Sequence, residues 1–315
     1  MATIIVTGIA GSLARLTALE LLRRGDEVIG VDYRPKPKSF PKGVVFYRAN
    51  YNKTRIADVF RRHKPDAVFH LGRVATRRVD GNKRFDLNVV GSAKIQELAV
   101  RHEVRVLVVL STYHIYGAHP HNHVPIVEDE PVRALQTVPE LSDAIQLDTQ
   151  AVTWTYRHRK MRTIVLRPSN IIGPHINNTT CRYLRLPRIP YLLGFNPMWQ
   201  FIHETDLLRA LLAAVDSQDK WGAYNVTGRG ALPIVEALKL SGAPLVPVPT
   251  GLLKTYLRLN PGARPAIPGY LVDFLKYPVI TSDQRFRDTF GFEAQVGVTE
   301  AIRSSVTRMP MGAIL

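Results

Sequence analysis

The sequence predicts an α/β protein with a doubly wound parallel sheet and a smaller, discontinuous C-terminal domain. Three observations lead to this prediction. The short β-branched run Thr3–Val6 ends in a glycine turn at Gly8 and Gly11. Short apolar runs then alternate with amphipathic stretches of helical period. The run Val104–Leu110 is so uniformly apolar that it fits only a central strand buried on both faces.

The N-terminal strand and glycine turn continue as a βαβ unit. Leu13–Arg24 has polar residues at three- and four-residue spacing, which predicts a helix that ends at Gly25. Glu27–Val31 is the second predicted strand, and Asp32 stands at its C-terminal end. Glycines let backbone N–H groups approach a pyrophosphate at the helix N-terminus, and an aspartate in this place can accept both ribose hydroxyls. The unit therefore predicts a dinucleotide site.

Basic residues follow Asp32, and they bear on whether the dinucleotide is NAD or NADP. Arg34, Lys36 and Lys38 lie among prolines and can in principle meet the 2′-phosphate of NADP. Asp32 would repel that phosphate. The sequence therefore favours NAD, with NADP as the alternative.

The elements after this unit keep the alternation of strand and helix. Val44–Tyr47 and Ala67–His70 are predicted strands, Arg55–Arg62 is a predicted helix, and a long helix is expected from about Asn82 to His102. We expect a dinucleotide domain over residues 1–175, completed by about 197–228, and a substrate domain over 176–196 and 229–315. The proline-rich stretch from Pro244 to Pro278 belongs to the smaller domain.

Composition is that of an ordinary globular protein. The chain has 315 residues, 45% of them hydrophobic, enough for one large or two closely joined domains. Cys181 is the single cysteine, which excludes an internal disulfide. The N-terminus enters a predicted core strand at once, and no apolar stretch approaches the roughly 20 residues that span a bilayer. These features indicate a reducing, cytoplasmic setting.

The formal net charge of +16 is the unusual feature of the composition. It is spread over three groups of residues, namely Arg73, Arg77, Arg78, Lys83 and Arg84, then Arg157 to Arg162, then Arg182, Arg185 and Arg188. Such a surface attracts anions. The interpretations are a merely solvated basic surface, an anionic small-molecule substrate or an anionic membrane surface, whereas nucleic acid is disfavoured because no reading motif accompanies the charge. A homodimer is a further possible assembly.

Eight motifs in order carry a resemblance to a known family. They read VTGIAGSLA, VDYR, VFHLGRVA, LNVVGS, VLSTYHIYG, VLRPSNIIGP, FIHETDLLRAL and FGFEAQVGVTEAI. Together the chain resembles an extended short-chain dehydrogenase/reductase of the NAD-dependent epimerase and dehydratase group. The resemblance implies a Rossmann fold, with the substrate cleft between the two domains over the carboxyl ends of the strands.

The resemblance also implies which residues hold the cofactor. Asn50 takes a place where the family usually has an aspartate, and its amide oxygen can still accept from adenine. Asn88 either contacts the cofactor or bridges buried backbone. The implied cofactor-binding residues are Gly8, Ala10, Gly11, Ser12, Leu13, Asp32, Tyr33, Arg34, Asn50, Tyr51, Leu71, Gly72, Arg73, Asn88, Leu110, Ser111, Pro168, Asn170 and Ile171.

The catalytic centre departs from the family pattern. Relatives carry an acid/base tyrosine and a lysine four residues apart on the helix after the STYHIYG strand. Counting back from Arg167 places Ser142 and Gln146 there, and neither can do that chemistry. A Tyr-x-x-x-Lys pattern does occur at Tyr156 and Lys160, but it falls at the far end of the helix. We interpret that pair as part of a solvated basic face.

The remaining candidates for catalysis follow the central strand. Thr112 matches the family's substrate-binding hydroxyl, and Tyr113 and His114 occupy the two places that hold the acid and base in sugar-nucleotide dehydratases. They can form a rewired acid/base pair. The alternative is a packed tyrosine and a hydrogen-bonded histidine.

A histidine-rich loop raises the question of a metal site. His119, His121 and His123 alternate between Pro120 and Pro125 in a loop without a nearby cysteine, so we expect no metal.

Two functions stay open. The first is an NAD(H)-dependent epimerase, dehydratase or reductase with an altered acid/base set, acting on an anionic substrate such as a nucleotide sugar. The second is a non-catalytic NAD(H)-binding sensor or scaffold.

Overall fold

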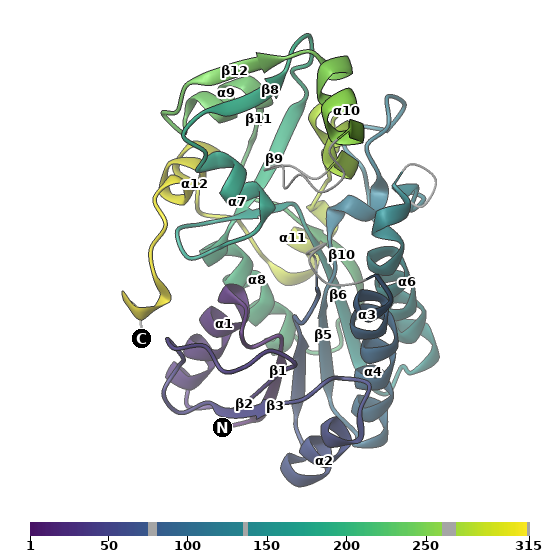
Figure 1. Cartoon of the computed structure of the whole chain (residues 1–315). Coiled ribbons are helices and arrows are strands. Elements are labelled where there is room, and N and C mark those ends of the chain that lie inside the picture. The colour runs from purple at the N-terminus through teal and green to yellow at the C-terminus, as the bar shows by residue number, and fades with distance from the viewer. Residues whose placement is uncertain (75–80, 135–137, 260–268, 314–315) are drawn as a thin grey trace.

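The computed structural model describes residues 1–74, 81–134, 138–259 and 269–313, so Arg77, Arg78 and part of the proline-rich stretch lie outside the described residues. A seven-stranded sheet with the order β10-β6-β5-β4-β1-β2-β3 forms the centre (Figure 1). Every neighbouring pair in it is parallel. Its strands are β1 Thr3–Thr7, β2 Glu27–Asp32, β3 Val45–Arg48, β4 Ala67–His70, β5 Val106–Leu110, β6 Arg162–Pro168 and β10 Gly222–Val226.

Helices cover both faces of this sheet. One face carries α1 Ser12–Arg23, α8 Glu204–Asp216 and α11 Gln284–Phe290, and the other carries α2 Thr54–His63, α4 Gly91–Arg101 and α6 Ser142–Arg157. Side chains alternate between the two faces of the sheet along each strand, which accounts for the two cores. Ile4 and Val6 of β1 pack with the helices of the first face, whereas Ile5 packs with those of the second. The predicted doubly wound sheet is confirmed.

The order of the strands places the candidate site. Strand β1 lies between β2 and β4, and the chain builds outward from it in both directions. The carboxyl ends of all seven strands therefore meet at one edge, and the turns after β1 and β4 separate at the switch point. The glycine turn follows β1 at this edge.

The long helix expected over residues 82–102 is interrupted. It consists of α3 Gly81–Phe85, a π-helical turn over Asp86–Val90, and then α4. Such turns widen a helix locally and occur often at functional sites. Asn88 lies within this turn, and its side chain bonds to the backbone of Val74, outside the helix.

The smaller domain is built from later segments and lies above the carboxyl edge of the sheet in Figure 1. It contains a three-stranded sheet, β11-β9-β7, and a two-stranded sheet, β12-β8. Its elements are β7 Asn170–Ile172, α7 Thr179–Leu184, β8 Ile189–Leu192, β9 Met198–His203, β11 Ala231–Pro233, α9 Ile234–Lys239, β12 Leu245–Val248, α10 Thr250–Leu259 and α12 Val298–Val306. Short 3₁₀ turns occupy Tyr113–Tyr116, Pro139–Leu141, Gly269–Leu271, Asp273–Leu275 and Met311–Ala313.

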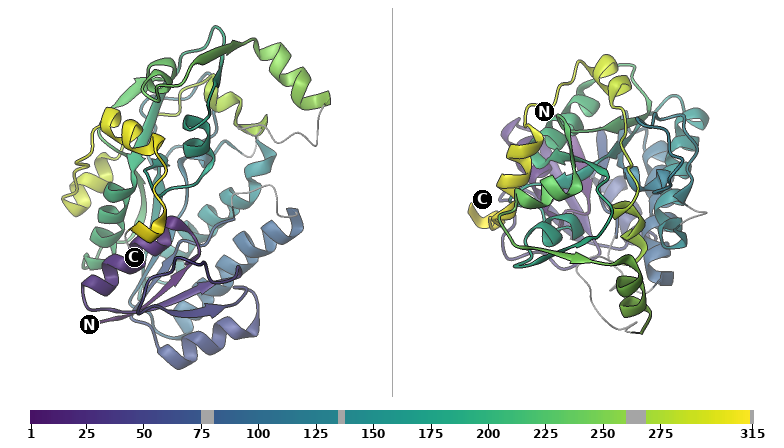
Figure 2. Two further views of the ribbon diagram at one scale, coloured as in Figure 1. Left: turned by 60° about the vertical axis from the view of Figure 1, so that its left-hand side comes forward. Right: turned by 90° about the horizontal axis from the view of Figure 1, so that it is seen from above.

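The two domains share elements. Strands β7 and β9 fall in segments expected in the dinucleotide domain, yet they pair with each other in the smaller sheet. Helix α8 and strand β10, which follow β9, belong to the larger domain. After α12 the chain bonds to the loop that follows β7, where Met309 N donates to Pro174 O at 2.9 Å, and the last described residues lie beside α1 (Figures 1 and 2).

Across the described residues, no helix combines the length and the apolar character needed to cross a membrane.

Candidate functional site

The glycine turn after β1 is tight and leaves no room for side chains. Gly11 N donates to Gly8 O at 2.7 Å. Gly8 has φ +72°, and a Cβ there would lie 2.5 Å from Gly72 Cα. Gly11 is the N-cap of α1 and offers no side chain to the first N–H groups of the helix, which begins at Ser12 and Leu13. Backbone donors at a helix N-terminus with no side chain in front of them form a phosphate-binding arrangement.

Asp32 at the end of β2 is fully buried, and its carboxylate accepts four hydrogen bonds. Oδ1 accepts from Arg34 N at 2.9 Å and from Arg34 Nε at 3.0 Å. Oδ2 accepts from Ala10 N at 2.9 Å and from Arg34 Nη2 at 2.8 Å. The Arg34 guanidinium also lies over the ring of Tyr33. Sequence reasoning assigned Asp32 to the ribose but did not foresee that Arg34 would pair with it.

Leu71, Gly72 and Arg73 follow β4, and Gly72 lies directly against Gly8 of the glycine turn. The hydroxyl of Tyr51 accepts from Gly8 N at 2.9 Å. A Cβ on Gly72 would lie 2.2 Å from the Tyr51 hydroxyl, so the buried tyrosine explains why this position is glycine. Burial raises the pKa of Tyr51 well above its usual range. The half-buried Asn50 precedes it.

A chain of buried polar groups lies behind the glycine turn. Thr7 Oγ1 is 2.8 Å from His70 Nδ1, and His70 Nε2 is 2.7 Å from Ser92 Oγ. Ser92 Oγ donates to Asn88 O at 2.6 Å. Burial lowers the pKa of His70 to about 4, so the ring is neutral near neutral pH. His70 was not among the predicted site residues, because a histidine at the end of a strand gives no indication of its partners in the fold.

Asn88 bridges buried backbone, one of the two roles considered for it. Its Oδ1 accepts from Val74 N at 2.7 Å, and its Nδ2 donates to Val74 O at 2.9 Å. The same Nδ2 donates to Asp143 Oδ2 at 2.5 Å, and Arg84 Nε lies 3.2 Å from that oxygen. The π-helical turn thus fixes the segment after Gly72 against α6.

Thr112, Tyr113 and His114 lie together at the end of β5. Thr112 Oγ1 is 2.8 Å from His114 Nδ1. Burial raises the pKa of Tyr113 far above its usual range, although its hydroxyl bonds to Asn170. Burial, and then the charge of Arg73, lowers the pKa of His114 to about 3. Both side chains are therefore neutral near neutral pH, and both carry a hydrogen that can be donated.

A small cavity of about 30 Å³ adjoins these residues. It lies between the end of β5 and the smaller domain, and aromatic side chains from both contribute to it. It is lined by Tyr113, His114, Asn170, Thr179, Thr180, Tyr183, Trp199, Leu271, Phe274 and Leu275. The His114 and Phe274 rings meet edge to face, 4.8 Å between centroids, and close one side.

Ser111, between Leu110 and Thr112, ties this segment to α6. Its hydroxyl donates to Asp148 Oδ1 at 2.5 Å, and Arg167 of β6 donates to both oxygens of the same carboxylate. The chain then passes through the buried Pro168 to β7, where Asn170 Nδ2 donates to Gln200 O at 3.0 Å and Ile171 packs between the two domains. These contacts bring the residues expected near a nicotinamide to one edge.

Helix α6 does not present Ser142 and Gln146 to that edge. At 3.6 residues per turn, Gln146 points about 160° and Ser142 about 120° away from Asp148. Gln146 is exposed. Ala144, one turn before Asp148, lies only about 40° from it. The face of α6 that meets the strand ends thus carries Ala144 and Asp148.

Tyr156 and Lys160 lie at the opposite edge of the sheet. Tyr156 is 59% exposed, and its ring meets that of Trp221 at 5.5 Å. Trp221 directly precedes β10, so this contact is at the amino ends of the strands. The Arg159 guanidinium lies over the same indole ring.

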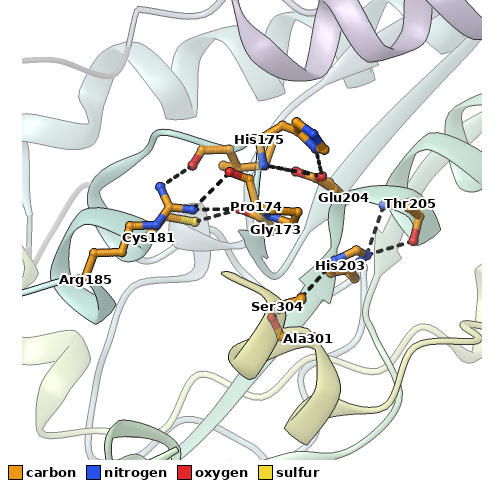
Figure 3. Close-up of polar contacts among 11 residues, drawn as sticks. Gly173, Pro174, His175, Cys181, Arg185, His203, Glu204, Thr205, Ala301 and Ser304 are labelled. Carbon is orange, nitrogen blue, oxygen red and sulfur yellow. Dashed lines mark hydrogen bonds and ion pairs between the residues drawn. The ribbon is translucent and has the colours of Figure 1, made fainter. Parts of the chain in front are cut away.

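A second polar cluster lies where β7, β9 and α12 meet (Figure 3). His175 is hydrogen-bonded to the buried Glu204 through both its backbone N and its Nδ1. His203 Nε2 lies 3.2 Å from Ser304 Oγ, and its Nδ1 lies 2.7 Å from Thr205 Oγ1. These bonds join His175 and His203 to Glu204 and Thr205 of α8, so the cluster connects the strands of the smaller domain to a helix of the larger one.

Among the described residues, no three histidine, cysteine, aspartate or glutamate side chains are grouped so that they could hold a metal ion. In the expected histidine loop, His123 Nδ1 lies 2.7 Å from Glu130.

A doubly wound sheet with a glycine turn at its switch point defines a Rossmann-type α/β protein. The model of the NAD dependent epimerase/dehydratase family matches residues 4–227. The chain belongs to this family, as the eight motifs indicated.

Curated relatives agree with this assignment. An uncharacterized protein of Mycobacterium tuberculosis is 30% identical over 242 residues, which cover 75% of this chain and 63% of the relative. The match thus spans somewhat under two thirds of that relative's length. A bifunctional UDP-glucose 4-epimerase and UDP-xylose 4-epimerase of Arabidopsis thaliana is 27% identical over 293 residues, covering 78% of this chain and 82% of the relative.

Solved structures show the same fold. MoeE5 in complex with UDP-glucuronic acid and NAD superposes with a TM-score of 0.77 at 20% identity, covering 96% of this chain and 97% of the other. The UDP-glucose 4-epimerase of Thermus thermophilus, in complex with NAD, gives a TM-score of 0.76 at 22% identity over the same shares of both chains.

Proposed function

We propose that this protein is an NAD(H)-dependent oxidoreductase or isomerase of the epimerase/dehydratase type with an altered acid/base set. One observation carries the proposal. The glycine turn after β1 and the hydrogen-bonded Thr112 and His114 after β5 lie at the same edge of the sheet, beside a cavity that reaches into the smaller domain.

The residues present fit the pyrophosphate of a dinucleotide. Gly8 and Gly11 leave the backbone accessible, and the first N–H groups of α1 have no side-chain cap. Leu71, Gly72 and Arg73 line the next turn, and Asn170 and Ile171 lie at the far end. When bound, the nicotinamide supplies reversible oxidation of a carbon that bears a hydroxyl or carbonyl group.

The chain's own residues would orient the reacting group. Thr112 binds the substrate oxygen, and the neutral His114 and Tyr113 donate hydrogen bonds to it as negative charge develops there. Neutral imidazoles with a lowered pKa serve this role in other enzymes. Ser142 and Gln146 point away from the site, and the facing residues of α6 are Ala144 and Asp148, so no Tyr–Lys pair is assigned. The task of binding and polarising the reacting oxygen therefore falls on the segment after β5.

The proposed substrate is anionic, and a nucleotide sugar is the leading class. Relatives act on UDP-sugars, and one structural neighbour holds UDP-glucuronic acid. Within the site, the charge of Arg73 reaches His114. The net charge of +16 would draw an anion toward the cleft, and it would equally favour an anionic membrane surface.

A homodimer is also proposed. The single, buried and free Cys181 fits the reducing cytoplasm, where we propose that the protein acts.

The second candidate is a non-catalytic NAD(H)-binding sensor or scaffold. The pKa values of Tyr113 and His114 favour it, because neither group exchanges a proton readily near neutral pH. Mass spectrometry of the small molecules released from freshly purified protein tests both candidates. NAD(H) with a nucleotide sugar, followed by turnover of UDP-glucose or UDP-glucuronic acid, supports the enzyme. NAD(H) alone with no turnover favours the sensor, and absence of any dinucleotide contradicts both.

A further inference from the structure

The outer end of the smaller domain carries exposed aliphatic side chains. Strands β8 and β12 and helix α10 lie at the end of this domain that is furthest from the large sheet, and we call these three elements the outer tip (Figures 1 and 2). Leu252 of α10 is 66% exposed, Leu193 directly after β8 is 54% exposed, and Val246 of β12 is 39% exposed. Large apolar side chains that gather on one exposed region mark a surface that contacts another body.

The three exposed residues belong to adjoining segments. Strands β8 and β12 form a two-stranded parallel sheet, and Leu193 N extends it by donating to Val248 O at 3.1 Å. Helix α10 begins at Thr250, two residues after β12 ends. Pro247 within β12 has no N–H to offer to a further strand. The outer tip therefore presents a surface of side chains, and it is poorly suited to pairing with an added strand.

The same segments carry cations and no acidic residue. Residues 171–203, which include α7 and β8, contain no aspartate or glutamate, and neither do residues 240–272, which include β12 and α10. The whole chain has 26 acidic residues, so two such runs depart from its composition. Glu236, just before the second run, is paired with Lys239 at 2.9 Å. The cations of the two runs are Arg182, Arg185, Arg188, Lys254, Arg258 and Arg264.

An anionic bilayer matches both properties of the outer tip. Its headgroups attract the cations, and the boundary between headgroups and acyl chains accepts leucine and valine side chains. A second copy of the chain would set cations against cations if this face met itself. Nucleic acid would meet the cations, but bases stack on aromatic rings, and the exposed large apolar residues in the described part of the tip are aliphatic.

We infer that the outer tip docks this protein on an anionic membrane surface. Leu193, Val246 and Leu252 reach the boundary between headgroups and acyl chains. The exposed Arg182 and Arg188 meet the lipid phosphates. Neither kind of contact is strong by itself, and together they give reversible, salt-sensitive attachment.

The candidate cavity lies directly behind the docking surface. Tyr183 of α7 lines the cavity, and its hydroxyl donates to Pro190 O of β8. Docking therefore holds the cavity close to the membrane. The inference uses no contact to a dinucleotide, so it goes beyond the proposed function and does not rest on it.

Cosedimentation of the full chain with vesicles tests the inference, using phosphatidylcholine alone and phosphatidylcholine mixed in equal parts with phosphatidylglycerol. The wild type should bind the mixed vesicles and not the neutral ones, and added salt should weaken the binding. Val246→Glu should lower the partition coefficient by about tenfold or more, because it places a carboxylate at the acyl boundary. Val45→Glu is the matched control, since Val45 is 41% exposed in the edge strand β3 of the large sheet and should retain the binding.

A pair of charge reversals tests the cations separately. One cation near an anionic surface contributes about fivefold to partitioning, so the double variant Arg182→Glu and Arg188→Glu should bind about twentyfold more weakly or worse. The double variant Lys53→Glu and Arg55→Glu changes the net charge equally, at exposed positions where α2 begins. This control should keep most of the binding.

Salt-sensitive binding to the mixed vesicles that is lost in the tip variants and kept in the controls supports the inference. Absence of binding by the wild type, or equal losses in tip and control variants, overturns it. A dimer of the wild type that Val246→Glu splits, seen by light scattering, would assign the face to a second copy and also overturn it. So would RNA binding that the tip variants lose while vesicles are ignored. Circular dichroism identifies an unfolded variant, and the other tip variant then supplies the comparison.

Discussion

The guanidinium of Arg167 holds the carboxylate of Asp148 through two hydrogen bonds, Nε to Oδ1 at 3.0 Å and Nη2 to Oδ2 at 2.7 Å. Both side chains are at least 95% buried. Ser111 donates to the same carboxylate, so the pair joins α6 and β6 to the segment that carries Thr112. It is a structural support placed directly behind the candidate catalytic residues.

Breaking this pair from one side should destabilise the protein strongly. In Asp148→Ala the Arg167 charge stays buried without its partner, so we expect the free energy of unfolding to fall by about 3–5 kcal/mol. Urea denaturation measures the change. Asp58→Ala, which removes one half of the exposed pair with Arg61, should cost no more than about 1 kcal/mol. Similar losses in the two variants would contradict the structural role of Asp148.

Acidification should destabilise the fold through His70. Its pKa is lowered to about 4 in the folded chain, whereas the unfolded chain has the ordinary value near 6.5. The unfolded state therefore binds more protons between these values, and stability falls as pH falls through that window. Between about pH 7 and about pH 5 this one residue accounts for about 2 kcal/mol. Denaturation of the wild type and His70→Gln at both pH values checks it, since the variant should lose that part of the pH dependence.

Turnover should depend on the segment after β5 and not on the distant Tyr-x-x-x-Lys pattern. Thr112→Val, Tyr113→Phe and His114→Ala should each lower kcat by about tenfold or more, because each removes a donor at the reacting oxygen. Tyr156→Phe should leave kcat unchanged, since Tyr156 lies at the amino ends of the strands. NADH absorbance with UDP-glucose, UDP-glucuronic acid and simple ketones is the measurement. A loss confined to Tyr156→Phe would revive the ordinary dyad.

The pH profile of that turnover should lack an inflection near the ordinary histidine pKa of about 6.5. The pKa of His114 is lowered to about 3, so the imidazole is already neutral throughout the range in which the protein is assayed. A base with an ordinary pKa would instead make the rate rise with pH through that value. Such a rise, present in the wild type and absent in His114→Gln, would contradict the neutral-donor role.

Closing the glycine turn should abolish cofactor binding without unfolding the chain. A Cβ on Gly11 would lie 3.1 Å from Gly8 O, a tight contact short of an outright clash, and the branched side chain of Gly11→Val blocks approach to the first N–H groups of α1. Fluorescence titration with NADH should show no saturable binding. Gly297→Val, at the N-cap glycine of α12, which has φ −66° and open space around a Cβ, controls for a general effect of added bulk. Retained binding in Gly11→Val would move the pyrophosphate elsewhere.

The repeating pattern of the sequence was sufficient to predict the large sheet, but it did not predict the π-helical turn or the pairing of β9 with β7. Uniform apolar runs such as that of β5 identify parallel strands, and the motifs identify the family that the family model confirms. The π-helical turn was not predicted, because it depends on Asn88 bonding to Val74 and Asp143, two contacts across the fold. From the sequence, strand β9 was assigned to the larger domain, because its pairing with β7 is likewise a contact between distant segments that periodicity does not reveal.

Within the site, backbone-determined features were easier to predict than side-chain partners. Gly8 and Gly11 lie where the turn requires glycine. Asp32 was placed correctly at the end of β2, but its pairing with Arg34 is a choice among rotamers that no periodicity records. The count that put Ser142 and Gln146 on the inner face of α6 assumed a connection length, and a shift of two residues turns a helix by about 200°. The roles of the named cofactor and catalytic residues stay predictions.

The interleaving of the two domains along the chain affects the order in which this protein can fold during its synthesis. Strand β10 closes one edge of the large sheet by pairing with β6, yet the chain makes most of the strands of the smaller domain between them. Phe286 of α11 joins the larger core later still. An emerging chain therefore leaves the edge of β6 unpaired until residue 226 has been made, and the core of the larger domain lacks Phe286 until α11 appears. The larger domain therefore completes its core only near the end of synthesis, after most strands of the smaller domain have been made.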